Sequence, residues 1–317
     1  MSALPAVSVV IPTHDRRDLL AGALRGVLEQ SGGVDLEVLV VDDGSSDGSA
    51  EMVRGLREPR IRLLHHEAAA GVSAARNRGI AEADGEWVAL LDDDDLWAPD
   101  KLARQLKAAE ERSRCWAYAG VVEVDADGRL LGGTPPPTPE DLVAGLAGRN
   151  LMPAGSSNVI VRHEALSQVG AFDEGLRHLA DWDLWLRLAK VGIPACAPEP
   201  LVAYRIHHSQ ATLDTTGMVG EARVLEARHG ANPASIYRWL GWSHLRLGQR
   251  GMAARAYVRA VGAGDPSSLL RAGGALLLPR PTRRDPVSSE ERRWFEPAEA
   301  WLRESTGSRI DPSSGST

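Results

Sequence analysis

Two patterns of apolar residues alternate along the first third of the chain. Short continuous runs rich in valine, isoleucine and leucine predict buried strands, and stretches with an apolar residue every three or four positions predict amphipathic helices. The expected strands cover residues 7–11, 36–41, 61–64 and 87–91, and the expected helices cover residues 17–30, 46–56, 72–83 and 101–111. Strands that are apolar on both faces and alternate with helices are typical of a mostly parallel sheet covered on each side. The pattern therefore predicts an α/β fold.

The pattern is less regular beyond residue 111 and becomes purely helical near residue 217. Further strands are expected at residues 116–124, 157–161 and 201–206, a hairpin turn at 125–128, and helices at 140–148, 181–191, 235–247 and 251–261. The last two helices resemble one tetratricopeptide unit, but stacked repeats need several copies. We therefore expect an α/β domain at residues 1–215, a helical C-terminal appendage at 216–305, and a disordered tail rich in Ser and Gly at 306–317.

The composition restricts the class of protein. The chain of 317 residues carries a formal net charge of −7. This argues against a general nucleic-acid binder, because such proteins neutralise phosphates with a basic surface. Only two cysteines occur, Cys115 and Cys196, which are too few for a disulfide framework or a cysteine-based zinc site.

The sequence also bears on location. The first residues lack the basic and apolar regions of a secretory signal, and no stretch approaches the roughly 20 apolar residues that span a bilayer. A cytoplasmic protein is therefore expected. The nearest stretch, residues 269–278, precedes Arg280, Arg283 and Arg284 and is expected to be a core helix. A peripheral contact with the inner face of the membrane stays open for the same stretch.

Polar side chains follow three of the expected strands. Pro12 and His14 follow the first strand, Asp43 follows the second, and four aspartates at residues 92–95 follow the fourth. Ligands of parallel sheets bind beyond the carboxyl ends of the strands. We therefore expect these residues to share one edge of the sheet.

The run of four aspartates needs a source of positive charge. Two like charges about 4 Å apart cost roughly 1 kcal/mol in water and several times more when partly buried. One interpretation is a solvated acidic cap on the helix that begins near Pro99. The other is a site for Mg²⁺ or Mn²⁺, since hard cations take oxygen ligands from carboxylates and phosphates. Strand-like alternation places Asp92 and Asp94 on one side, so we expect these two to bind the metal and Asp93 to face the substrate.

Two further segments suit a nucleotide. Asp43 could accept hydrogen bonds from a base N–H or from ribose hydroxyls, and this is the interpretation we favour for it. Ser46 and Asp47 in the same segment also suit a turn with a helix N-cap, and for Asp47 the two interpretations stay equal. Residues 71–79 open the next expected helix. Arg76 and Arg78 there could reach a diphosphate, or they could form a solvated helix face.

Later residues supply a candidate base and a further candidate ligand. Asp181 and Asp183 flank Trp182 at the start of an apolar helix. A helix N-terminus favours an ionised carboxylate, which suits a proton acceptor but also merely complements the helix dipole. His207 follows the last expected strand, and its imidazole could complete a metal site or serve a structural role.

In combination these segments resemble the inverting family 2 glycosyltransferases of the GT-A fold. The matching segments are residues 7–12, 38–47, 71–79, 85–95 with Trp97, Pro99 and Asp100, and 181–186. Their order and spacing agree over roughly residues 5–210. The resemblance implies a Rossmann-like GT-A sheet and a hexosyltransferase-type enzyme with a nucleotide-diphospho-sugar donor, first of all a UDP-sugar. The implied acceptor is a hydroxyl of a glycan, a lipid-linked intermediate or another molecule in cell-surface polysaccharide or glycoconjugate synthesis.

The resemblance assigns the nucleotide side of the site. Asp43 matches the aspartate that binds the nucleobase in such enzymes. Pro12 and His14 lie in the loop that lines the nucleotide pocket. Arg76 and Arg78 lie in the segment expected near the donor.

It also assigns the reacting side. Residues 92–94 correspond to the DxD motif, which binds the donor diphosphate through Mg²⁺ or Mn²⁺, and His207 falls where some members provide a further metal contact. Asp181 matches the second residue of a Glu-Asp pair that supplies the catalytic base. The residue before it is Ala180 instead of glutamate, so the choice between Asp181 and Asp183 stays open.

Two other functions fit parts of the pattern. A sugar nucleotidyltransferase would need a glycine-rich phosphate loop after the first strand, and residues 12–17 contain no glycine. A non-catalytic scaffold acting through its helical tail would tolerate the loss of Asp94 or Asp181.

Overall fold

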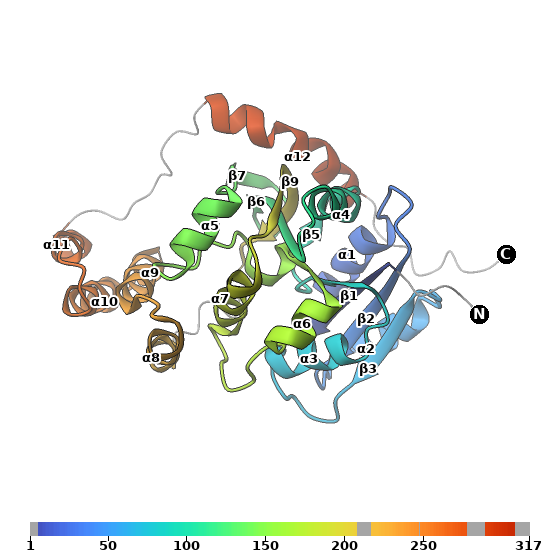
Figure 1. The fold of residues 1–317 in the computed structure, drawn as a ribbon, viewed down its shortest axis with the longest axis horizontal. Coiled ribbons are helices and arrows are strands. Elements are labelled where there is room, and N and C mark those ends of the chain that lie inside the picture. Colours follow the sequence, from blue (N-terminus) through green and yellow to red (C-terminus); the bar gives the residue numbers. More distant parts are fainter. Residues whose placement is uncertain (1–5, 208–216, 247, 278–288, 308–317) are drawn as a thin grey trace.

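The computed structural model describes residues 6–207, 217–246, 248–277 and 289–307, and the strands in these ranges form one sheet (Figure 1). They are β1 (Val7–Thr13), β2 (Leu36–Asp42), β3 (Ile61–His65), β4 (Trp87–Leu90), β5 (Leu96–Trp97), β6 (Trp116–Val124), β7 (Leu130–Thr134), β8 (Ile160–Arg162) and β9 (Ala195–Arg205). Their order is β3-β2-β1-β4-β8-β6-β9-β5, with β7 paired to β6. Strands β1 to β4 are parallel, and β8 runs antiparallel to both β4 and β6. The predicted α/β class is confirmed.

Helices cover both faces of this sheet. They are α1 (Arg17–Leu28), α2 (Ser49–Gly55), α3 (Val72–Ala81), α4 (Lys101–Glu111), α5 (Pro139–Leu146), α6 (His163–Val169), α7 (Ala180–Val191), α8 (Met218–His229), α9 (Pro233–Arg246), α10 (Arg250–Gly262), α11 (Ser268–Leu277) and α12 (Ser289–Gly307). Successive strand residues enter different cores: Val10 packs with α3 and α7, whereas Val9 packs with α1 and α4. This explains why the strands read as continuous apolar runs.

Several expected elements differ in their bounds, and the strand expected at residues 201–206 begins already at Ala195 in β9. The helix expected from residue 46 begins at Ser49, because Gly48 has a φ of 87° and Asp47 Oδ1 accepts hydrogen bonds from Ser49 N at 3.0 Å and Ser49 Oγ at 2.6 Å. The strand expected at residues 157–161 is instead a 3₁₀ turn, Gly155–Asn158, followed by β8. The turn packs against β4 and β6 and brings Asn158 between them and α4.

The C-terminal helices separate into three groups. Helices α8 and α9 extend the core beside α7, and α10 and α11 pack beyond them (Figure 1). Helix α12 returns to the sheet, where Phe295 and Trp301 are buried against β6 and β9. The division at residue 215 remains a prediction, and most of the tail expected from residue 306 lies outside the described residues.

One expectation for this region is wrong. Helix α11 forms at the predicted place, yet it is not a core helix, since Leu270 and Leu277 are each 84% exposed. No helix among the described residues is long and apolar enough to cross a membrane.

Candidate active site

The acidic run after β4 contacts basic side chains from distant parts of the chain. Arg16, in the loop after β1, places Nη1 at 3.0 Å from Asp93 Oδ1 and 2.8 Å from Asp94 Oδ2. His207, just after β9, brings Nε2 to 3.0 Å from the same Asp94 oxygen. Thr13 Oγ1 donates a hydrogen bond to Asp93 Oδ2 at 2.8 Å. The loops after β1, β4 and β9 therefore meet at this cluster, as the position of these residues after strands predicts.

The carboxyl groups of the run differ in proton affinity. Burial and the charge of Asp94 raise the pKa of Asp93 to about 6, although Arg16 and Thr13 oppose the shift. Burial also disfavours the ionised form of Asp94, but the hydrogen bond from His207 and the charge of Arg16 outweigh it and lower the pKa of Asp94. Burial and two neighbouring carboxylates raise the pKa of Asp95 well above its ordinary value. Asp95 Oδ1 accepts the backbone N–H of Arg205 at 3.0 Å, which fits a role in positioning the run.

Asp92 is turned to a different partner. Its carboxylate forms an ion pair with the buried Arg76 of α3, and its backbone N–H donates to Ser157 Oγ at 3.0 Å. The Arg76 guanidinium lies 5.1 Å from the centre of the Phe172 ring, within cation–π range. Arg76 is therefore a core-facing cation that contacts the acidic run, and its role in binding a diphosphate stays a prediction.

Among the residues that the structure describes, no group of three or more His, Cys, Asp or Glu side chains is arranged to hold a metal ion. Asp94 and His207 contact each other, whereas Asp92 contacts Arg76. The expected metal ligands Asp92, Asp94 and His207 thus stay a prediction, and only Asp94 and His207 contact each other.

Asp43 organises the loop between β3 and α3. Its Oδ1 accepts hydrogen bonds from His66 Nδ1 at 2.7 Å and Ala70 N at 2.8 Å, and its Oδ2 accepts one from Gly71 N at 2.8 Å. Burial by itself would raise the pKa of Asp43, but these three donors outweigh burial and lower it. The carboxylate is ionised and fixed at the edge of the site, with Oδ2 holding a further acceptor lone pair.

The other residues expected around the nucleotide lie at different depths. Pro12 is buried within β1 opposite Val41 of β2. His14 is exposed, and its Nδ1 lies 2.8 Å from the carbonyl oxygen of Asp43. Arg78 donates to the carbonyl oxygen of His65 at 2.8 Å, so the structure places it at the end of β3 and not at the acidic run.

Asp181 begins α7 beside the Arg76 pair. Its Oδ1 accepts the backbone N–H of Trp182 at 2.7 Å. Burial, together with the charge of Asp92, raises the pKa of Asp181 against the opposing charge of Arg76. A Cβ at Gly155, whose φ is +51°, would come within 3.0 Å of Asp181 Oδ2, so glycine there leaves space beside the carboxylate.

Asp183, unlike Asp181, is held by the side chains of Arg187 and His229. It is 1% exposed, Arg187 Nε and Nη2 both lie 2.8 Å from its Oδ2, and His229 Nε2 lies 2.8 Å from its Oδ1. Arg187 also donates to the carbonyl oxygens of residues 169–171. The group ties α7 to α8 and to the loop after α6.

Sequence reasoning missed Arg16, His66 and His229 as partners of these carboxylates. Each comes from an element that is distant in sequence from its partner. Arg16 carried a signal, since it follows the first strand within the polar loop 12–17 that was expected at the site. For His66 and His229, a single sequence contains no signal that would indicate these contacts.

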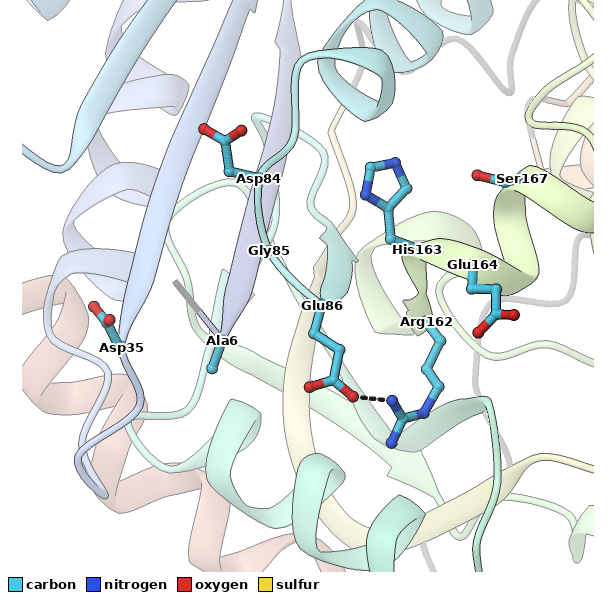
Figure 2. A pocket seen from close by; sticks show the side chains of 9 residues that line it. All are labelled: Ala6, Asp35, Asp84, Gly85, Glu86, Arg162, His163, Glu164 and Ser167. Atoms are coloured by element: carbon cyan, nitrogen blue, oxygen red, sulfur yellow. Dashed lines mark hydrogen bonds and ion pairs between the residues drawn. The ribbon is translucent and has the colours of Figure 1, made fainter. Parts of the chain in front are cut away.

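A separate hollow lies away from the acidic run. A depression of about 730 Å³ is lined at its rim by Asp84, Glu86, Arg162 and His163, with Glu86 paired to Arg162 (Figure 2). These residues precede β4 or adjoin α6, at the amino ends of β1 and β4. The depression is therefore at the opposite end of the strands from the acidic cluster, and we do not assign the chemistry to it.

Comparison with known sequences decides the family. A family model described as Glycosyl transferase family 2 matches residues 8–178. The chain belongs to glycosyl transferase family 2. The matched region contains the loop of Arg16, the Asp43 loop and the acidic run, and this family-2 protein is accordingly an enzyme of the glycosyltransferase class.

Individual relatives agree with this membership. TuaG of Bacillus subtilis (strain 168), named provisionally as a teichuronic acid biosynthesis glycosyltransferase, is 33% identical over 205 residues, covering 64% of this chain and 79% of TuaG. ExoO of Rhizobium meliloti, a succinoglycan biosynthesis protein, is 32% identical over 224 residues, covering 66% of this chain and 63% of ExoO. The chain thus spans slightly less than two thirds of ExoO.

Solved structures confirm the GT-A fold. TarS of S. aureus (residues 1–349 with UDP-GlcNAc) superposes with a TM-score of 0.59 at 17% identity, covering 85% of this chain and 87% of TarS. The mannosyltransferase PcManGT of Pyrobaculum calidifontis, solved with GDP-Man and Mn²⁺, gives a TM-score of 0.55 at 21% identity, covering 96% of this chain and 87% of PcManGT. At these identities the likeness concerns the fold alone.

Proposed function

We propose that this family-2 enzyme transfers a sugar from a nucleotide-diphosphate donor, a UDP-sugar, to an acceptor hydroxyl in cell-surface polysaccharide or glycoconjugate synthesis, with inversion at the anomeric carbon. The observation that carries the proposal is the meeting of Arg16, Arg76 and His207 with three carboxylates at the carboxyl ends of the strands. Cations and carboxylates that already pair with one another can exchange partners with an anionic diphosphate and a metal ion.

The donor side of the proposal rests on the loops around Asp43. The ionised carboxylate keeps an acceptor site for a base N–H, and His14 and Pro12 belong to the adjoining loop. The TarS structure contains UDP-GlcNAc. A relative from Escherichia coli, WfgD, 32% identical over 126 residues, is named as a glucosyltransferase from UDP-Glc to a GlcNAc-diphosphoundecaprenol acceptor. These names favour a UDP-sugar donor and keep a lipid-linked acceptor among those proposed.

A divalent cation fits the acidic cluster. Asp94 and His207 offer oxygen and imidazole ligands that already touch at 3.0 Å, and Asp92 lies in the same run. The position of the Arg16 guanidinium between Asp93 and Asp94 supports this, because these carboxylates already pair with one positive group. Asp92, Asp94 and His207 would hold Mg²⁺ or Mn²⁺, whose charge would stabilise the departing diphosphate.

The proposed base is Asp181. Burial raises the pKa of this carboxyl, which increases its affinity for a proton. It takes the proton of the acceptor hydroxyl while the acceptor oxygen forms its bond to the anomeric carbon and the bond from that carbon to the diphosphate oxygen breaks. The nucleoside diphosphate leaves with the electron pair, and a single displacement inverts the configuration. Arg76, paired with Asp92 and near Asp181, holds the acidic run and the base in a fixed relation.

A thermal-shift panel of nucleotide sugars tests the proposal. We expect a UDP-sugar to raise the unfolding temperature with Mn²⁺ or Mg²⁺ but not with EDTA, and the gain to vanish in Asp94→Asn. Asp127→Asn, which changes an exposed carboxylate in the β6–β7 turn, is the matched control. Equal stabilisation in EDTA would remove the metal from the proposal, and no response to any nucleotide sugar would contradict the donor class.

A further inference from the structure

Helix α11 exposes an unusual number of leucines. Leu269, Leu270, Leu276 and Leu277 are 63%, 84%, 55% and 84% exposed. They form two adjacent pairs two helical turns apart, so they share one face of the helix. The opposite face, with Ala272 and Ala275, is buried against α10. The outward leucines are therefore additional to what the fold needs.

Helix α10 also carries exposed apolar side chains, and it adds positive charge. Met252 and Val258 are 48% and 56% exposed on its outer face, and the exposed Arg255 and Arg259 stand among them. Buried Tyr257 packs on α11 and fixes the two helices as one unit.

The charge of this unit is opposite to that of the whole chain. The two helices contain four arginines and no aspartate or glutamate: Arg250, Arg255, Arg259 and Arg271. The chain as a whole carries −7. Asp265, in the connection between the helices, is paired with Arg238 of α9 at 2.9 Å. A negatively charged partner would therefore be attracted to this unit and repelled by much of the remaining molecule.

We propose that α10 and α11 form a docking surface for an anionic lipid bilayer. Exposed leucines that enter the acyl region and arginines that meet the headgroups are the combination by which amphipathic helices bind such a surface. Helix α11 is about 15 Å long, half of the roughly 30 Å apolar layer, so it lies in the interface and does not cross. Figure 1 shows α10 and α11 at the outer end of the helical region, beyond α8 and α9, where a flat surface can reach them. The proposal is independent of the donor and the reaction proposed above.

Co-sedimentation of the full chain with vesicles tests this inference. We expect binding to vesicles that contain phosphatidylglycerol, weaker binding to pure phosphatidylcholine, and a decrease as NaCl rises from about 0.1 to 0.5 M. Leu270→Ser combined with Leu277→Ser should reduce binding on the order of 100-fold, because each buried leucine contributes about tenfold or more. Leu131→Ser, which changes a leucine of β7 that is 40% exposed, is the matched control and should bind like the wild type.

A second pair of substitutions measures the electrostatic contribution to vesicle binding. Arg255→Gln with Arg259→Gln should lower binding to the anionic vesicles roughly tenfold or more and leave binding to neutral vesicles nearly unchanged. Circular dichroism and the thermal shift with a nucleotide sugar check that every variant is folded, since all changed side chains are exposed. No vesicle binding by the wild type, or equal binding by the leucine variant and the wild type, overturns the proposal. The proposal is also overturned if the wild type is a dimer, the leucine variant is a monomer, and neither binds vesicles.

Discussion

Replacing Asp181 and Asp183 in turn separates proton transfer from stability, although the two residues are only two positions apart. Asp183→Asn leaves the guanidinium of Arg187 and the ring of His229 facing a neutral amide in a buried site. Removing one partner of a buried ion pair costs about 3–5 kcal/mol. Arg187 keeps its backbone carbonyl acceptors, so we expect a value near the lower end. At roughly 2–4 °C per kcal/mol, the unfolding temperature should fall by about 6–12 °C.

Asp181→Asn should have the opposite profile. Burial raises the pKa of Asp181, so a neutral side chain of the same shape costs little there, and stability should change by less than about 1 kcal/mol. The amide cannot accept the proton of the acceptor hydroxyl, and the transfer rate should fall about 10²- to 10⁴-fold.

Thermal unfolding and initial transfer rates, measured on both variants at a temperature where both are folded, give the comparison. Donor binding by thermal shift should persist in Asp181→Asn. Normal transfer by Asp181→Asn, or a fully stable Asp183→Asn that no longer transfers sugar, refutes the assignment and moves the base to Asp183. Asp127→Asn again serves as the control for loss of one carboxylate.

Three further substitutions follow from single contacts. Lys101 is fully buried, its Nζ has no hydrogen-bond partner and lies 3.5 Å from the centre of the Trp97 ring, and burial lowers its pKa well below the ordinary value. Because the unfolded chain therefore binds more protons than the folded one, the stability of the wild type should rise with pH toward about 10. In urea unfolding series, Lys101→Met should stabilise the protein by about 1–3 kcal/mol near pH 7, and this gain should shrink as the pH rises. Arg16→Gln removes the cation that shares the Asp94 oxygen with His207, so calorimetry should find Mn²⁺ alone binding about tenfold tighter or more; unchanged Mn²⁺ affinity would place the metal elsewhere. Asp43→Asn turns an amide NH₂ toward the N–H of Ala70 or Gly71 and should lower the free energy of unfolding by about 1–3 kcal/mol. Backbone amides of residues 66–71 should then exchange hydrogen faster, and slow exchange there would show that the loop does not depend on Asp43.

The parallel half of the fold could be predicted because its information is local. Each of β1 to β4 is an apolar run and each following helix has its own periodicity, so the sequence alone places them within a few residues. The two-residue β5 carries no period of its own, and it exists because Leu96 and Trp97 pair with β9. Helix α12 is amphipathic, but nothing in its sequence indicates that its apolar face covers β6 and β9.

The same distinction applies to the site. The position of Asp43 and the acidic run at one edge could be predicted, because residues that follow strands of a parallel sheet share one edge. Whether Asp181 or Asp183 faces that edge could not be predicted, since the answer depends on His229, which lies in a different helix. The two-residue difference in helical position turns Asp183 into the core and leaves Asp181 beside Arg76.

The pairing of the acidic run with cations of the chain bears on how a donor would bind. Arg16 is shared between Asp93 and Asp94, so it can turn to a diphosphate only if those carboxylates keep a positive neighbour. In the proposed site, a divalent cation that took its place on Asp94 beside His207 would supply that charge, and a diphosphate would add oxygen ligands for it. Metal and donor should therefore bind with positive coupling, and the coupling should be the same whichever binds first. Asp93 strengthens this reasoning, because burial and the charge of Asp94 raise its pKa to about 6 even with Arg16 beside it, and loss of the arginine without replacement would raise that pKa further.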